Sequence, residues 1–206
     1  MGLWDRHVMP RMIGCCCCQP PIMEKRALVV PLAEGDVLEL GIGGGANLAL
    51  YDPARVRSVS GVDPSPELLD RARDALPHAR VPVDIRAGVA EALPYPDGRF
   101  DTVVTTYTLC SVGDPARALA EARRVLKPGG KLLFLEHGRA PDPGPLRWQR
   151  RIEPLWKRAM GNCHLSRPVA DAILAAGFTV PQRSGEYMPG MPRWASWMEW
   201  GEARPS

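Results

Sequence analysis

The segment at positions 37–48, VLELGIGGGANL, constrains the fold of this chain more than any other. An apolar strand here leads into glycines, whose missing side chains let the backbone turn tightly and approach a ligand closely. A second apolar strand follows over 56–62, and Asp63 lies at its end, 22 positions after Gly41. At that offset a carboxylate can accept hydrogen bonds from ribose hydroxyls. The pattern predicts a nucleotide-like cofactor at the carboxyl edge of a sheet.

The rest of the chain alternates short apolar runs with longer amphipathic ones. This is typical of an α/β fold, a doubly wound, mostly parallel sheet, here of seven strands, with helices on both faces. We expect strands at 36–40, 56–62, 83–86, 100–109, 131–136, 178–180 and roughly 193–200. We expect helices from about Ala46, at 66–76 behind a Ser65 cap, at 115–126, and at 167–176 before Gly177.

The length of 206 residues fits one domain. We expect an N-terminal arm over 1–33 and the domain over 34–206, with a lid-like insertion at about 141–166. The insertion contains a basic, Trp-containing helical stretch, LRWQRRIEPLWKRAM. Pro154 inside it predicts two short helices or one kinked helix.

Charge and hydropathy restrict the partners. Lys plus Arg number 26 and Asp plus Glu 23, a net charge of +3, which is too small to indicate nucleic acid. No stretch approaches the ~18 to 20 apolar residues of a spanning helix, and the first residues lack a secretory signal pattern. We therefore expect a cytoplasmic protein; the sequence leaves its oligomeric state open.

Six cysteines are present, four of them consecutive, Cys15 to Cys18. Cys15 and Cys18 form a C-x-x-C, but Cys110 and Cys163 belong to no second pair with metal-ligand spacing. We therefore expect no metal site. Reduced thiols that pack as small hydrophobic groups are the simpler interpretation.

The glycine turn alone does not identify the cofactor. Gly41, Gly43 and Ala46 also satisfy the fingerprint of dinucleotide-binding folds, which leaves an NAD-dependent oxidoreductase as an alternative. That fold needs a second mononucleotide-binding half and a substrate domain, and the chain after the third strand is short for both.

Four segments in order carry a resemblance to a known family: ELGIGGG at 39–45, the post-strand Asp63, AEALPYPDGRFD at 90–101 and RRVLKPGGKLLFLEHG at 123–138. In these the chain resembles a class I S-adenosylmethionine-dependent methyltransferase of the type 11 domain group. More narrowly, TLCSV at 108–112, EHG at 136–138 and GNCHLSR at 161–167 resemble the small branch that includes alkyl-thiol methyltransferases.

The resemblance implies a Rossmann-like methyltransferase fold, S-adenosylmethionine as methyl donor and S-adenosylhomocysteine as product. It assigns donor contacts to nine residues: Glu39 near the methionine end, Gly41, Gly43 and Gly45 in the turn, Asp63 on both ribose hydroxyls, Pro64 at the adenine edge, Ala90 and Glu91 in the adenine pocket, and Thr106 beside the sulfur. Many relatives have an acidic residue where this chain has Val89. A backbone carbonyl or Glu91 would then accept from the adenine amino group.

Methyl transfer is an in-line displacement, so the protein's main task is to align the acceptor about 3 Å from the methyl carbon and to exclude water. For a thiol acceptor a nearby base helps, because the thiolate is the nucleophile. His137 and Cys110 are the catalytic candidates, with structural packing as the alternative for each. We expect a small, fairly apolar acceptor, with a thiol as one candidate. A phospholipid amine at a membrane surface is the runner-up, because the residues at 147–158 interleave cations with tryptophans.

Overall fold

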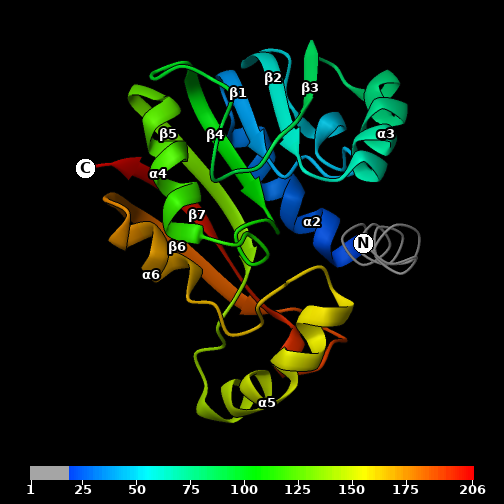
Figure 1. The fold of residues 1–206 in the computed structure, drawn as a ribbon, viewed down its shortest axis with the longest axis vertical. Coiled ribbons are helices and arrows are strands. Elements are labelled where there is room, and N and C mark those ends of the chain that lie inside the picture. Colours follow the sequence, from blue (N-terminus) through cyan, green and yellow to red (C-terminus); the bar gives the residue numbers. More distant parts are fainter. Residues whose placement is uncertain (1–18) are drawn as a thin grey trace.

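A computed structural model describes residues 19–206, which form one seven-stranded sheet in the order β3-β2-β1-β4-β5-β7-β6 (Figure 1). The strands are β1 (Gly35–Leu40), β2 (Val56–Asp63), β3 (Val83–Ala87), β4 (Phe100–Thr106), β5 (Leu126–His137), β6 (Phe178–Tyr187) and β7 (Trp197–Pro205). The first five pair in parallel, and β7 runs antiparallel to both of its neighbours. The expected mostly parallel, seven-stranded α/β sheet is confirmed.

Helices cover both faces of the sheet. They are α2 (Pro20–Val29), α3 (Pro66–Ala75), α4 (Pro115–Val125), α5 (Pro143–Ala159) and α6 (Val169–Ala175). On one face, apolar residues of α4 and α6 pack with Leu38 and Leu40 of β1. On the other face, Val29 of α2 packs with Val37 of the same strand. Successive strand residues point to opposite faces, so one strand supplies both layers of the core.

Two predicted helix ends are confirmed, the start of α3 and the stop after α6. The Ser65 side chain accepts a hydrogen bond from the Leu68 N–H at 3.3 Å, as an N-cap does. Gly177, just after α6, has φ +80°, a left-handed conformation that glycine adopts without steric cost.

The helix expected from about Ala46 is wrong. Only one 3-10 turn, Leu48–Leu50, forms there. The segment between Gly45 and β2 is short and contains Pro53, which cannot donate to a helical ladder. α2, from the region expected as an arm, covers this face of the sheet instead.

Several strand ends also differ from the prediction. β4 ends at Thr106 rather than Leu109, because Tyr107 has φ +58° and turns the chain out of the sheet. β6 is longer than predicted, and β7 starts later, after a 3-10 turn at Arg193–Ala195. These two strands pair with each other from Phe178↔Pro205 to Tyr187↔Trp197, so pairing rather than local hydrophobicity sets their length.

α5 lies beyond the carboxyl end of β5 (Figure 1). Pro154 lies inside one continuous helix. Of the two forms expected here, the pair of short helices is therefore wrong. Gln149 anchors the helix, because its buried side chain accepts from the Ala140 N–H and donates to the Gly138 carbonyl. No helix within residues 19–206 is long and apolar enough to cross a membrane. Cys15 to Cys18 lie outside the described residues.

Candidate functional site

A cavity of about 580 Å³ opens at the carboxyl ends of four neighbouring parallel strands. This is where ligands bind in open α/β sheets. Of the nine residues predicted to contact the donor, seven line the cavity: Gly41, Gly43, Asp63, Pro64, Ala90, Glu91 and Thr106. Glu39 and Gly45 do not line it, and neither do His137 and Cys110.

The glycine turn forms one wall of the cavity. Gly41 has φ +65°, and a Cβ there would collide with the Thr108 side chain. Gly45 has φ +79° and lies behind the turn, where a Cβ would come within 3.1 Å of the Ala75 Cβ on α3. The missing side chain of Gly41 therefore leaves room for Thr108 in the cavity wall. The missing side chain of Gly45 lets the turn pack closely against α3.

Asp63 is held in place by two backbone donors. Its Oδ2 accepts from the Gly43 N–H at 3.0 Å, and its Oδ1 accepts from the Ser65 N–H at 2.9 Å. Burial raises the pKa of this carboxyl, while both hydrogen bonds oppose that rise. The carboxylate is thus oriented beside the cavity and ties the glycine turn to the end of β2.

Glu39 lies beneath the cavity. Its two oxygens accept from Asn47 Nδ2 and from the Tyr51 hydroxyl, each at 2.7 Å. Complete burial raises the pKa of Glu39 to about 7. Asn47 Nδ2 also donates to Thr106 Oγ1 at 3.0 Å, so Glu39 acts on the cavity wall through Asn47.

Arg26 of α2 also lines the cavity, and sequence reasoning missed it. Its Nη1 donates to Asn47 Oδ1 at 2.8 Å and to Thr106 Oγ1 at 2.7 Å. Its guanidinium lies 5.0 Å from the centroid of the Tyr107 ring. Arg26 is only 5% exposed, and its Nε has no hydrogen-bond partner in the described structure. A buried guanidinium with an unused donor beside a cavity is suited to an anionic ligand group. No motif spacing marks Arg26, because it comes from the expected arm.

Val89 and Glu91 lie on the opposite side of the cavity. Glu91 Oε1 accepts from the backbone N–H groups of Gly113 and Asp114, at 2.9 and 3.2 Å. This ties the loop after β3 to the segment that caps α4. Val89 presents an apolar side chain, 42% exposed, where the resemblance leads us to expect a carboxylate.

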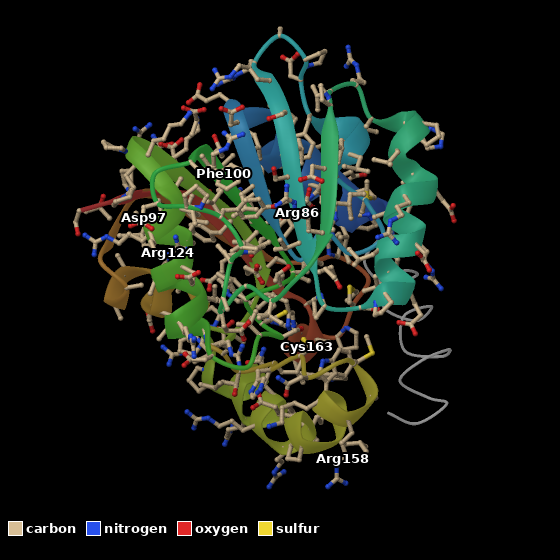
Figure 2. All side chains as sticks on the ribbon, turned by 45° about the horizontal axis from the view of Figure 1, so that its top comes forward. Arg86, Asp97, Phe100, Arg124, Arg158 and Cys163 are labelled. Atoms are coloured by element: carbon tan, nitrogen blue, oxygen red, sulfur yellow. The ribbon has the colours of Figure 1, made fainter. Side chains whose placement is uncertain are left out.

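The two catalytic candidates lie together behind the cavity. His137 Nδ1 is 3.9 Å from Cys163 Sγ, and the Cys110 side chain also interacts with Cys163. Figure 2 shows Cys163 between the sheet and α5. Glu136, next to His137, accepts from the N–H groups of Thr108, Leu109 and Cys110, so it fixes the loop after β4. A catalytic role for His137 or Cys110 stays a prediction.

No group of three or more His, Cys, Asp or Glu side chains within the described part of the chain could hold a metal ion.

The strand order, the reversed β7 and the glycine-walled cavity define a Rossmann-like methyltransferase fold. Residues 38–134 match the methyltransferase domain family. Among solved structures, geranyl diphosphate methyltransferase in complex with SAM superposes with a TM-score of 0.71 at 16% identity, over 89% of this chain and 84% of that one.

Two curated relatives are closer in sequence. A phosphatidylethanolamine N-methyltransferase of Cereibacter sphaeroides is 41% identical over 73% of this chain and 75% of its own length. Thiol S-methyltransferase TMT1B of Rattus norvegicus is 38% identical over 78% of this chain and 66% of its own length, so the match spans slightly less than two thirds of that relative. This chain belongs to the class I S-adenosylmethionine-dependent methyltransferase family.

Proposed function

We propose that this protein transfers a methyl group from S-adenosylmethionine to a small, fairly apolar thiol. The observation that carries the proposal is the cavity in which Gly41, Asp63 and Thr106 meet at the carboxyl ends of β1, β2 and β4. The thiol methyltransferase of the rat supports the acceptor class. The alternative of an NAD-dependent oxidoreductase loses support. The sheet continues beyond β5 with β7 and β6, which pair antiparallel to each other, and not with a second mononucleotide-binding half.

The residues of the cavity fit the chemical parts of this donor. Asp63 would accept from the ribose hydroxyls, and the glycine turn lets the chain approach closely. Arg26 would bind the carboxylate of the methionine end, which is the anionic group of the donor. When bound, the donor supplies a methyl group on a positively charged sulfur, and the protein positions the acceptor in line with it.

We place the acceptor in the part of the cavity next to the loops that follow β4 and α5. Tyr107, Val112 and Gly161 line the cavity there, and its described lining contains neither histidine nor cysteine. The acceptor would therefore bind as a thiolate that has already ionised in solution. For a given thiol, we expect the rate to rise with pH up to the pKa of that thiol.

The test is incubation with methyl-labelled donor and a panel of thiols, amines, phenols and lipids, read by mass spectrometry. Each thiol is matched with the alcohol of the same carbon skeleton. We expect label in the thioether product of apolar thiols and none in the matched alcohols. Label in amines or lipids alone would refute the thiol proposal but not methyl transfer itself.

A second acceptor class, a phospholipid amine, is favoured by the outer face of α5. Trp148 and Leu155 there are 55% and 71% exposed, beside the exposed cations Arg147, Arg151 and Arg158. Arg158 projects away from the body of the molecule (Figure 2). An exposed apolar pair among cations is suited to an anionic lipid surface. The phosphatidylethanolamine N-methyltransferase among the relatives supports this reading.

Vesicle co-sedimentation tests the lipid surface. We expect binding to vesicles with anionic lipid, lost when Arg147 and Arg151 are both changed to Gln. Changing Arg55 and Arg57, at the opposite end of the sheet, removes the same charge and is the matched control. Equal loss in both pairs would show unspecific charge attraction and would remove the support for a lipid acceptor.

A further inference from the structure

Cys110 and Cys163 lie on two loops that face each other beyond the ends of β4 and β5. The His164 N–H donates to the Cys110 carbonyl at 2.9 Å, and Asn162 Nδ2 donates to the Ser111 carbonyl, also at 2.9 Å. These two bonds flank Cys163 on either side. They bring the Cys163 and Cys110 side chains close enough to interact.

The two thiols differ in exposure and in charge. Cys110 is 2% exposed, whereas Cys163 is partly exposed. The interaction with Cys110, followed by that with His137, holds the pKa of the Cys163 thiol well below its usual range. The contact with Cys163 and burial raise the pKa of Cys110. The two shifts thus favour the thiolate at Cys163 and the protonated thiol at Cys110.

His137 supports this assignment by its position. Its Nδ1 faces Cys163 Sγ at 3.9 Å, while its Nε2 is buried and has no hydrogen-bond partner in the described structure. In the tautomer with its proton on Nδ1, the ring would donate to the sulfur and stabilise a thiolate. None of these three side chains lines the cavity, so none faces the proposed donor directly.

We propose that Cys163 and Cys110 form a reactive dithiol site, in which Cys163 attacks hydrogen peroxide and Cys110 then closes an intramolecular disulfide. In the first step Cys163 sulfur attacks one peroxide oxygen, the O–O bond breaks, and the hydroxide that leaves takes a proton to become water. In the second step Cys110 sulfur attacks the sulfenic acid, the S–S bond forms, and the hydroxyl leaves as a second water with the proton of Cys110. Two thiols lose two electrons, and one peroxide becomes two waters.

The disulfide would join the loop after α5 to the loop after β4. Both loops contribute to the cavity, through Gly161 and Ser111 respectively. Oxidation at this site would therefore fix one wall of the proposed acceptor side.

The reactivity of Cys163 is measured by alkylation. In a variant with Cys15 to Cys18 changed to Ser, iodoacetamide labelling of Cys163 and Cys110 is followed by peptide mass spectrometry from pH 6 to pH 8. An ordinary thiol with pKa ~8.5 speeds up about 75-fold over this range, because its thiolate fraction grows. We expect Cys163 to change less than about twofold and Cys110 to react slowly throughout. A Cys163 rate that rises like that of an ordinary thiol would overturn the proposal.

The disulfide is tested with hydrogen peroxide in the same variant. We expect a peptide pair linked through Cys110 and Cys163, which a dithiol reductant separates. Cys110→Ser should stop at a sulfenic acid on Cys163 that dimedone traps, and Cys163→Ser should form neither product. Absence of the linked pair in the protein that keeps both thiols would overturn the proposal. Neither measurement depends on methyl transfer, so the two proposals can fail separately.

Discussion

Arg26 Nη1 donates a hydrogen bond of 2.7 Å to Thr106 Oγ1, across 80 positions of sequence. The bond joins α2, from the region before the glycine motif, to the end of β4. The arm region is therefore part of the cavity wall.

Replacing Arg26 by Met should weaken binding of S-adenosylhomocysteine about 10- to 100-fold. A charged hydrogen bond contributes about 1.5 to 3 kcal/mol, and 1.4 kcal/mol corresponds to tenfold in affinity. Methylthioadenosine lacks the amino-acid group, so its affinity should change less than about twofold. Calorimetric titration with both ligands measures the ratio. Lys25→Met, which breaks an ion pair with Glu186, is the control, and equal loss for both ligands would contradict the role of Arg26.

Replacing Asp63 by Ala should abolish most of the rise in Tm that S-adenosylhomocysteine produces in the wild-type protein. A ligand that binds only the folded state stabilises it by mass action, and the ribose would lose its acceptor. The Gly43 and Ser65 N–H groups would also lose theirs, so the Tm without ligand should fall. Asp84→Ala, an exposed carboxylate on β3, is the control. A wild-type ligand shift in Asp63→Ala would refute the ribose contact.

Gly41→Ala should destabilise the protein more than Gly98→Ala. Both positions have positive φ, +65° and +61°, so each substitution costs about 1 to 2 kcal/mol in backbone strain. Only at Gly41 does the new Cβ meet another side chain, that of Thr108, and such overpacking costs about 1 to 3 kcal/mol more. Urea unfolding of both variants measures the difference. Equal destabilisation would show that Thr108 moves aside.

Glu39 should make the free energy of unfolding fall between pH 4.5 and pH 7. Burial raises the pKa of Glu39 from 4.5 to about 7, so over this range the unfolded chain releases a proton that the folded chain keeps. The stabilisation is fully present below pH 4.5 and is lost as pH rises through 7. Relative to Glu39→Gln, the wild type should lose on the order of 3 kcal/mol between pH 4.5 and pH 8.

Denaturant unfolding of the wild type and Glu39→Gln at both pH values measures this change. Glu34→Gln is the control. Lys131 lowers the pKa of that surface carboxyl, so the difference between the wild type and Glu34→Gln should show no such loss of stability as pH rises. A constant difference between the wild type and Glu39→Gln would mean that Glu39 is ionised in the fold throughout.

Local patterns were enough to predict several residues of the cavity wall. Gly41 and Asp63 were identified from the sequence because a glycine turn after a strand and an acidic residue after the next strand both depend on short segments. The helix predicted from about Ala46 failed for the opposite reason: whether a short segment becomes a helix depends on what else covers that face, and α2 covers it.

The sequence by itself determined the α/β class, the parallel strands, the glycine turn and the position of Asp63, because these follow from periodicity and turn chemistry within a few residues. Only the tertiary structure decided that Arg26 enters the cavity, and that His137 and Cys110 meet Cys163 outside its lining. Those contacts join segments separated by 26 to 80 positions. No local pattern encodes such a separation, because the packing of whole helices and loops on the sheet brings the segments together.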